Sequence, residues 1–283
     1  MSVLRARAPG KVNLCLFVGE PRADGLHPLV SVVQALSLAD ELTLAPGTGA
    51  DEVVCPGVEG PNLAARALAL YREATGWDAP PQRLTIEKRI PVAAGMGGGS
   101  SDAAATLRLA ARAAGRPVPP GLAPRLGADV ASLLRPGRVL MTGAGEHVTP
   151  LASPPPPLGL LVLPVEAELS TPAVYREADR LGLARSHTEL AQLDALVRMG
   201  TWAPENDLQD AARSLCPLID TALAAARDAG ADHVLVSGSG PTVVGLFGGG
   251  DGPIRAAAAA TASGWPRAVA AEPVAEAWAA VRG

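Results

Sequence analysis

The residues best suited to chemistry lie in one glycine-rich stretch, PVAAGMGGGSSDAA, at 91–104. Its glycines and serines are Gly95, Gly97, Gly98, Gly99, Ser100 and Ser101. Glycine has no Cβ, so such a backbone can approach a ligand closely and turn its N–H groups toward one point. The alanine-rich run that follows predicts a helix, whose free N–H groups and positive dipole end favour an anion. The stretch therefore predicts a phosphate site at a helix start.

The common phosphate-loop patterns do not describe this stretch. No Lys precedes Ser100, which excludes G-x-x-x-x-G-K-[ST], and Ser100 stands where G-x-G-x-x-G needs its third glycine. The histidine–arginine–aspartate triplet of protein kinases is also absent. A flexible linker or a plain helix entry is the alternative. The strand-like run at 83–90 and the Ser-Ser-Asp at the helix start favour the phosphate site.

Lysine is scarce in this chain, which draws attention to the two that occur. Lys11 and Lys88 stand among 24 lysine and arginine residues. An ammonium is a compact point charge and a guanidinium is a planar fork, so these positions predict a need for the compact ion. Lys11 lies two residues from Asn13, and on a strand the two side chains share a face. Lys88 comes shortly before the glycine loop, so both lysines are candidates for the site.

Composition excludes several classes of function. The 283 residues are 48% hydrophobic and 18% charged with a net charge of -4, which supplies a substantial core but no basic surface for nucleic acid. Three separated cysteines without a C-x-x-C pair argue against a disulfide framework or a zinc site and favour a reducing cytoplasm. We find no signal-peptide core and no apolar run of membrane length. We therefore expect a cytoplasmic protein that does not bind nucleic acid.

Strands and helices alternate irregularly in the first half of the chain. Strands are predicted at 3–7, 12–18, 29–36, 41–44, 51–55, 83–90, 139–142 and 147–151, with a turn at 8–10. Helices are predicted to begin at Asn62, at Ser100 and near Asp129, and the first two end at Gly76 and Gly115. Asn62 and Asp129 are also good residues for a helix start, so capping alone would explain either of them.

Four prolines at 154–157 predict a domain boundary, which gives domains at 1–153 and 154–283. The second half predicts strands at 158–163, 233–236, 243–247 and 268–271, and helices at 190–197, 207–214, 217–229 and 254–262. A further helix has Pro172 in its first turn and carries Tyr175. A second glycine loop, SGSGPT, occupies 237–242. Strands mixed irregularly with helices favour the α+β class.

Three separated stretches together resemble the signature motifs of the GHMP small-molecule kinases. They are APGKVN at 8–13, GMGGGSSD at 95–102 and SGSGPT at 237–242. Further pieces are similar to the 4-diphosphocytidyl-2-C-methyl-D-erythritol kinases within that superfamily. These pieces are DGxH at 24–27, LGADV at 126–130, GxGE at 143–146 and NDL at 206–208. The ordered set extends from residue 6 to residue 247, so the resemblance covers most of the chain.

The resemblance implies a two-domain α+β fold, with an N-terminal S5-domain-2-like domain and a C-terminal ferredoxin-like domain. It also implies transfer of the ATP γ-phosphate, with Mg²⁺, to the 2-hydroxyl of 4-diphosphocytidyl-2-C-methyl-D-erythritol in non-mevalonate isoprenoid synthesis. Such an enzyme would be a monomer or a weak homodimer, with no nucleic acid or membrane as partner. Two other functions stay open: another GHMP kinase, such as one for homoserine or mevalonate, and a non-catalytic ligand sensor.

The resemblance also implies roles at the matching positions. Asp129 would accept the hydroxyl proton, and Lys11 would orient and assist it. Substrate contacts would come from Asn13, His27, Thr171, Tyr175, Gly238 and Gly240. ATP contacts would come from Asn62, Lys88, Pro91, Gly95, Gly97, Gly98, Gly99, Ser100 and Ser101. The Mg²⁺ ligands stay unassigned: Ser101 and Asp102 are candidates, although the helix start alone would explain a carboxylate at Asp102.

Three positions depart from the family pattern: Gly10, where the family more often has alanine, Pro28, which is unusual beside His27, and Leu26. Leu26 stands where the family has an aromatic ring that stacks on the cytosine. Tyr175 is then the aromatic platform expected for the base. Together, His27 and Tyr175 favour a pocket that recognises a base over the pocket of a sugar kinase.

Overall fold

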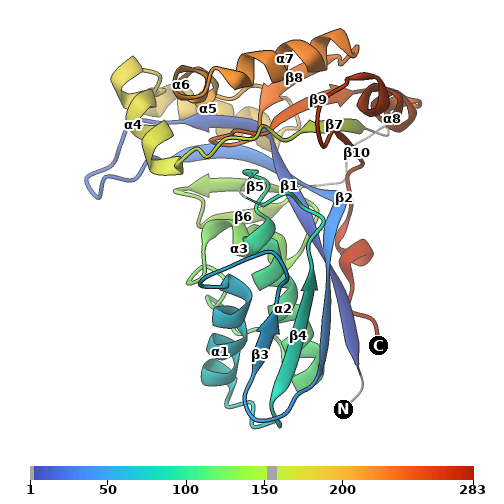
Figure 1. The fold of residues 1–283 in the computed structure, drawn as a ribbon. Coiled ribbons are helices and arrows are strands. Elements are labelled where there is room, and N and C mark those ends of the chain that lie inside the picture. Colours follow the sequence, from blue (N-terminus) through green and yellow to red (C-terminus); the bar gives the residue numbers. More distant parts are fainter. Residues whose placement is uncertain (1–2, 93, 152–157) are drawn as a thin grey trace.

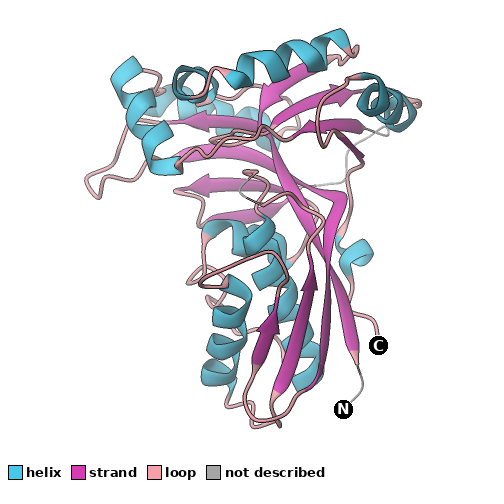
Figure 2. Cartoon of the chain, viewed as in Figure 1, coloured by secondary structure: helices cyan, strands magenta, loops and turns pink. Residues whose placement is uncertain are grey.

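Two β-sheets, one above the other in Figure 1, organise the chain. The computed structural model describes residues 3–92, 94–151 and 158–283. Helices pack against both sheets (Figure 2), in agreement with the predicted α+β class. The predicted boundary between 153 and 154, with its proline run, lies outside the described residues. Among the described helices, none has the length and apolar character needed to cross a membrane.

Two long antiparallel strands form the spine of the first sheet. Its strands are β1 (Leu4–Val18), β2 (Leu29–Pro46), β3 (Glu52–Val54), β4 (Gln82–Glu87), β5 (Arg138–Gly143) and β6 (His147–Pro150). β1 pairs with β2 from one end to the other. The other edge of β2 pairs with β4 through its second half and with β5 through its first half. β3 runs parallel to β4, and β6 runs antiparallel to β5.

The turn predicted at 8–10 is wrong, because these residues lie inside β1. The pairing with β2 shifts between Pro9 and Lys11, so the strand bends through a bulge and continues. Proline has no N–H for the ladder and glycine has no side chain, which suits a bulge as well as a turn. The strands predicted at 29–36 and 41–44 are likewise one strand, β2. Residues before the bulge pack in the core of the first domain, whereas Val12 and Leu14 pack against the second sheet.

Three helices pack against the first sheet. They are α1 (Leu63–Thr75), α2 (Gly98–Ala114) and α3 (Ala128–Leu134). Asn62 caps α1 as predicted, since its side chain accepts from the Ala64 N–H at 2.8 Å. Gly76 and Gly115 end α1 and α2 in the left-handed conformation that glycine adopts easily. The small alanines of α2 let it lie buried against β1, α1 and α3.

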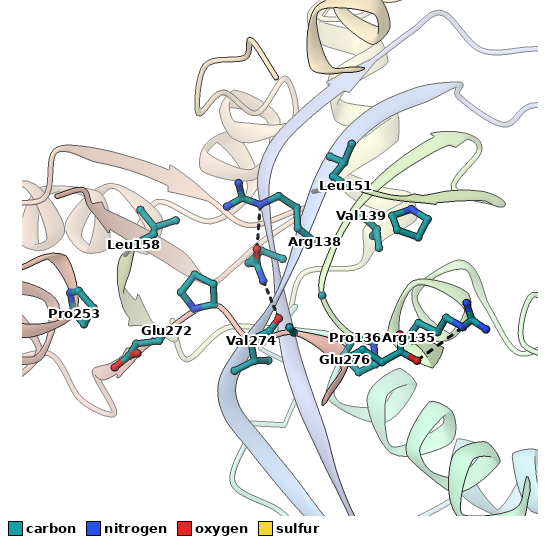
Figure 3. Close-up of a pocket in the computed structure, with 15 residues that line it drawn as sticks. Arg135, Pro136, Arg138, Val139, Leu151, Leu158, Pro253, Glu272, Val274 and Glu276 are labelled. Atoms are coloured by element: carbon teal, nitrogen blue, oxygen red, sulfur yellow. Dashed lines mark hydrogen bonds and ion pairs between the residues drawn. The ribbon is translucent and has the colours of Figure 1, made fainter. Parts of the chain in front are cut away.

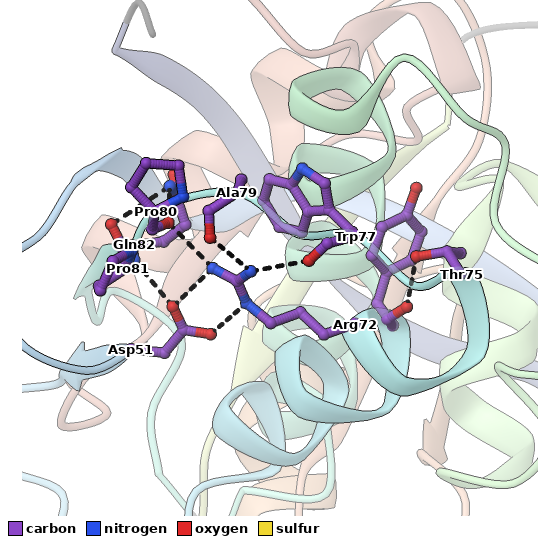
Figure 4. Close-up of polar contacts among 9 residues, drawn as sticks. Asp51, Arg72, Thr75, Trp77, Ala79, Pro80, Pro81 and Gln82 are labelled. Atoms are coloured by element: carbon purple, nitrogen blue, oxygen red, sulfur yellow. Dashed lines mark hydrogen bonds and ion pairs between the residues drawn. The ribbon is translucent and has the colours of Figure 1, made fainter.

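Arg72, in the last turn of α1, ties that helix to the segment before β4 (Figure 4). Its guanidinium donates to both Asp51 carboxylate oxygens, at 2.6 and 2.8 Å. It also donates to the carbonyls of Trp77, Ala79 and Pro80, and it lies 4.6 Å from the centroid of the Trp77 ring. All five guanidinium N–H groups are therefore used. A cation at this end of a helix is also favoured by the helix dipole.

The second domain is a four-stranded antiparallel sheet with helices packed on it, as expected for a ferredoxin-like domain. Its strands, in the order β10–β7–β9–β8, are β7 (Gly159–Leu163), β8 (His233–Val236), β9 (Val243–Phe247) and β10 (Val269–Ala271). Its helices are α4 (Thr171–Leu181), α5 (His187–Arg198), α6 (Gln209–Leu215), α7 (Leu218–Asp228) and α8 (Gly252–Ala262), followed by the 3₁₀ turn η1 (Glu276–Ala279). The four strands and the helices predicted for this half are confirmed, with shifts of a few residues at their ends.

A shared core joins the two sheets. Leu160 and Val162 of β7 pack with residues of β1 and β2, whereas the alternate residues of β7 pack under the helices of the second domain. Side chains alternate across a strand, so one strand supplies both contacts. The chain then returns to the first domain, where Arg5 and Arg282 exchange two backbone hydrogen bonds of 2.8 and 2.9 Å. The domains are thus joined by packed side chains as well as by the chain itself.

Candidate active site

Lys11 and Asp129 meet in the structure. Lys11 Nζ lies 3.6 Å from Asp129 Oδ2 and donates to Asn13 Oδ1 at 3.0 Å. Asn13 Nδ2 donates to Ser31 Oγ at 2.8 Å, and the Ser31 hydroxyl donates to the Cys15 carbonyl. Lys11 and Asn13 are buried, whereas 36% of the Asp129 side chain is exposed. The chain therefore fixes an ammonium beside a carboxylate that a ligand can still reach.

The guanidinium of Arg108 links strand β1, which carries Lys11, to helix α3, which carries Asp129. Arg108 of α2 donates through Nη1 to the Leu133 carbonyl at 2.8 Å and through Nη2 to the Arg7 carbonyl at 2.7 Å. Leu133 lies near the end of α3, and Asp129 lies in the first turn of that helix. Arg7 lies on β1, four residues before Lys11. Burial of Arg108 lowers its pKa to about 10, which leaves it charged at neutral pH.

The three signature motifs converge on Lys11 and Asn13. The Lys11 N–H donates to the Met96 carbonyl at 2.9 Å, so the first glycine loop runs alongside β1. The Asn13 N–H donates to Ser237 Oγ at 3.1 Å, so the second glycine loop reaches the same place from the other domain. Segments more than 200 residues apart in the sequence thus meet around one ammonium.

Glycine is required where the two loops touch. Gly95 has φ 71°, and a Cβ there would overlap the Gly240 carbonyl. Gly238 has φ 60°, and a Cβ there would lie 3.1 Å from Asn13 Oδ1. A side chain at either position would therefore push the loops apart or displace the side-chain amide of Asn13. This close approach explains why the motifs hold glycine at these positions.

The helix after the first loop begins earlier than predicted. α2 starts at Gly98 rather than at Ser100, and Gly97 precedes it with φ 67°. Gly98 and Gly99 therefore contribute first-turn N–H groups, which have no partner within a helix. The stem of Lys11 passes beside Gly97, where a Cβ would lie 3.1 Å from Lys11 Cγ. This arrangement suits an anion held between the helix start and the ammonium.

A cavity of about 360 Å³ opens beside this loop. Eight of the nine residues predicted to contact ATP line it: Asn62, Lys88, Pro91, Gly95, Gly97, Gly98, Gly99 and Ser100. The ninth, Ser101, does not line it, because its buried hydroxyl donates to the Pro9 carbonyl at 2.7 Å. Ser101 therefore fastens α2 to β1, and its backbone N–H is also used, since it donates to the Gly97 carbonyl at 2.8 Å. Val58 and Leu63 add apolar atoms to the wall of the cavity.

Lys88 is held between two carboxylates at the edge of this cavity. Its ammonium donates to Asp40 Oδ2 at 2.5 Å and to Asp102 Oδ2 at 2.8 Å. Asp40 is fully buried, and its other oxygen accepts from the N–H groups of Arg89 and Ile90. Burial raises the pKa of Asp102 to about 7, although the charge of Lys88 acts in the opposite direction. Asp102 Oδ1 has no hydrogen-bond partner among the described residues.

A second cavity, of about 460 Å³, lies between the loop after β1 and helix α4. The rings of His27 and Tyr175 meet in its wall with centroids 5.1 Å apart. Thr171 Oγ1 hydrogen-bonds Ser239 Oγ at 2.9 Å, which joins the start of α4 to the second glycine loop. Burial raises the pKa of Tyr175 to about 12, and the charge of Asp129 adds to that rise. Lys11 thus lies beside Gly97 in the wall of the first cavity, and the charge of Asp129 acts on Tyr175 in the wall of the second.

A larger cavity, of about 560 Å³, lies away from these residues (Figure 3). It is bounded by the start of β5 and by the segment before η1, and none of the predicted site residues lines it. Inside it, Arg138 Nε donates to Gln34 Oε1 at 3.1 Å. Size alone would therefore select this cavity, whereas the residues of the motifs line the two smaller cavities described above. Among the described residues, no group of three or more His, Cys, Asp or Glu side chains could hold a metal ion.

Three polar residues at these sites are not predicted from the sequence. Asp40 lies in an apolar strand, where a buried carboxylate needs partners. This setting is the only feature of the sequence that could have indicated it. Ser237 belongs to a predicted loop, but nothing in the sequence says which hydroxyl turns inward. Asp179 lies one helical turn after Tyr175, and its carboxylate lies 3.4 Å from His27 Nε2.

Comparison with known proteins bears on these two cavities. Residues 62–134 match the GHMP kinases N terminal domain, and residues 185–280 match the GHMP kinases C terminal domain. The 4-diphosphocytidyl-2-C-methyl-D-erythritol kinase of Kineococcus radiotolerans is 41% identical over 265 residues, which cover 86% of this chain and 81% of that protein. The chain belongs to the 4-diphosphocytidyl-2-C-methyl-D-erythritol kinase family. The enzyme of that name from a Nocardioides species is also 41% identical, over 94% of this chain and 95% of the relative.

The fold agrees with membership of the 4-diphosphocytidyl-2-C-methyl-D-erythritol kinase family. The crystal structure of a 4-(cytidine 5'-diphospho)-2C-methyl-D-erythritol kinase matches this structure with a TM-score of 0.78 at 37% identity, over 95% of this chain and 98% of that one. The predicted two-domain GHMP kinase architecture is therefore confirmed. Family membership also makes the chain an ATP-dependent small-molecule kinase.

Proposed function

We propose that this protein transfers the γ-phosphoryl group of ATP to the 2-hydroxyl of 4-diphosphocytidyl-2-C-methyl-D-erythritol, in non-mevalonate isoprenoid precursor synthesis. The observation that carries the proposal is the Lys11–Asp129 pair, 3.6 Å apart, with Gly97 of the glycine-loop cavity beside Lys11 and Tyr175 of the other cavity within reach of the Asp129 charge. ATP would occupy the glycine-loop cavity, and the cytidine would occupy the cavity of His27 and Tyr175. The acceptor hydroxyl would then meet the γ-phosphate beside the pair.

Asp129 is the proposed base. An aliphatic hydroxyl is a poor nucleophile at neutral pH, so a carboxylate that takes its proton as the bond to phosphorus forms would assist the attack. Asp129 is partly exposed toward the site, and it has the ammonium of Lys11 as its neighbour. Asn13 orients Lys11 and would also contact the acceptor end of the substrate.

The remaining task in phosphoryl transfer is to position the reactants and to stabilise charge. The backbone of Gly95, Gly97, Gly98 and Gly99, with Ser100, would hold the ATP phosphates at the start of α2. Lys11 would lie close to the transferred phosphoryl group because its stem passes beside Gly97. Gly238 and Gly240 would approach the substrate phosphates from the second domain. Asn62, Lys88 and Pro91 would line the nucleotide side.

The residues at the helix start fit Mg²⁺. Asp102 Oδ1 is a buried carboxylate oxygen without a hydrogen-bond partner among the described residues, and it belongs to the wall of the nucleotide cavity. Oxygen ligands of this kind suit a hard cation that is shared with phosphates. Asp102 would hold the ion together with the phosphate oxygens of ATP. When bound, Mg²⁺ would neutralise charge on the ATP phosphates.

Tyr175 and His27 would bind the cytosine. Tyr175 supplies an aromatic face in a cavity where Leu26, 52% exposed, supplies only an aliphatic one. Stacking of a base on such a ring contributes about 1–3 kcal/mol in other proteins. Thr171, tied to Ser239, would lie near the ribose. We further propose a cytoplasmic enzyme that works as a monomer or weak homodimer and binds no nucleic acid.

The test is ADP release by the purified protein with ATP and Mg²⁺. Four acceptors are compared: 4-diphosphocytidyl-2-C-methyl-D-erythritol, mevalonate, homoserine and galactose. We expect turnover with the cytidyl substrate alone, and we expect Asp129→Asn to lower it by about 100-fold or more with the fold intact. Turnover with another alcohol would make the protein a different GHMP kinase. Nucleotide binding without any turnover would make it a ligand sensor.

A further inference from the structure

The ring of His27 is fixed in one orientation. His27 Nδ1 lies 2.9 Å from the Gly19 carbonyl oxygen, which can only accept a hydrogen bond. In the neutral ring Nδ1 therefore carries the proton, and Nε2 is left as an acceptor. The His27 side chain is only 8% exposed, so few solvent molecules can reach Nε2.

His27 Nε2 faces the carboxylate of Asp179. The two atoms, Nε2 and Oδ1, lie 3.4 Å apart in the wall of the α4 cavity, and 44% of the Asp179 side chain is exposed. With a neutral ring, two acceptors face each other, and neither can donate to the other. A ligand that brings N–H groups to this point would satisfy both.

We propose that Asp179 and His27 Nε2 together bind the exocyclic amino group of cytosine, which makes Asp179 the residue that selects cytosine over uracil. This inference rests on the function proposed above. The amino group of cytosine is a donor with two N–H bonds, and a carboxylate is a suitable acceptor for it. Uracil has a carbonyl oxygen at the same position, so it would bring a third acceptor to the pair. That unpaired contact would disfavour the uridyl analogue.

Helix α4 presents the ring and the carboxylate together. Tyr175 and Asp179 lie four residues apart on α4, so they share one face of the helix. Tyr175 contacts the same His27 ring, with centroids 5.1 Å apart. One helix would thus supply the stacking surface and the selective acceptor, and its start is held to the second glycine loop through Thr171.

The test compares kcat/KM for the cytidyl substrate and for its uridyl analogue in the wild type and in Asp179→Asn. A well-placed base contact gives about 1–3 kcal/mol of discrimination, or roughly 5- to 150-fold, so we expect the wild type to favour cytidine by at least about 10-fold. In Asp179→Asn the amide can donate to the uracil oxygen, and we expect the ratio to fall to within about 3-fold, mainly through KM. Asp194→Asn, which changes a carboxylate in an exposed ion pair with Arg198, should leave the ratio unchanged.

Each outcome has one meaning. A wild-type enzyme without turnover on the cytidyl substrate overturns the proposed function itself. An active wild type whose preference for cytidine survives in Asp179→Asn overturns the role of Asp179 alone. A second measurement needs no variant and no substrate: the ¹⁵N chemical shifts of His27 in the free protein at neutral pH. The inference requires an Nε2 without a proton, so an imidazolium would overturn it because the proton on Nε2 would already fill the gap to Asp179.

Discussion

Lys11 is constrained along its whole length. Its N–H donates to Met96, its stem passes beside Gly97, and its ammonium lies between Asn13 and Asp129. Only 8% of its side chain is exposed. The space available thus fits a narrow stem with a compact charge at its end, which agrees with the presence of lysine in a chain that otherwise uses arginine.

Lys11→Arg should therefore fold but turn over slowly. The guanidinium is larger and planar, so it would displace Asn13 or push against Gly97. We expect kcat to fall by about 100-fold or more, because Asp129 would lose its oriented partner. The measurement is ADP release under saturating ATP, with circular dichroism to check the fold. Arg5→Lys, on the exposed start of the same strand, is the matched control and should keep the wild-type rate. A normal rate in Lys11→Arg would show that the shape of the cation does not matter.

At the scale of single residues, scarce lysines and clustered glycines predict that Lys11 and the first glycine loop belong to one site, and the structure places them side by side. A partner that comes from a distant element could not be predicted. Asp179 pairs with His27 across 152 residues of chain, and no spacing rule predicts such a contact. Ser101 is the opposite case: it belongs to the motif and was predicted to contact ATP, but its hydroxyl faces β1.

At the scale of elements, the ends of helices were predicted better than the unbroken course of long strands. Asn62, Gly76 and Gly115 mark helix ends through local backbone chemistry, and each is found there. The bend in β1 could not be predicted, because a proline–glycine pair suits a turn as well as a bulge, and only the pairing with β2 decides between them. The pairing of β1 with β2 is a long-range contact, and the residues near the bend do not reveal it.

The tie between α1 and the segment before β4 depends on Arg72. We expect Arg72→Ala to lower the free energy of unfolding by about 2–4 kcal/mol, because Asp51 and three carbonyls lose a charged donor together. The measurement is urea denaturation. Arg83→Ala is the control, since the Arg83–Glu52 pair is more than half exposed and should contribute less than about 1 kcal/mol. Equal losses of unfolding free energy in both variants would mean that the hydrogen bonds from Arg72 to the carbonyls do not add to stability.

At the scale of the whole molecule, the site exists only because two domains meet. Lys11 and the first glycine loop come from one domain, and Ser237, Gly238 and Tyr175 come from the other. The relative position of the domains is therefore part of the chemistry. The core shared by β7, β1 and β2 holds that position in the structure described here.

Because this core contains residues of both sheets, the two domains should unfold together. Trp77 packs in the first domain and Trp265 in the second. Variants in which one of these two is the only tryptophan left therefore report on each domain by fluorescence. We expect coincident urea midpoints for the two probes. Leu160→Ala should lower both midpoints equally, since it removes about 2–5 kcal/mol of buried contact from the joint core. If the Trp265 midpoint alone moved, the domains would be independent units, and the alignment of the catalytic loops would have to come from bound substrate instead of the fold.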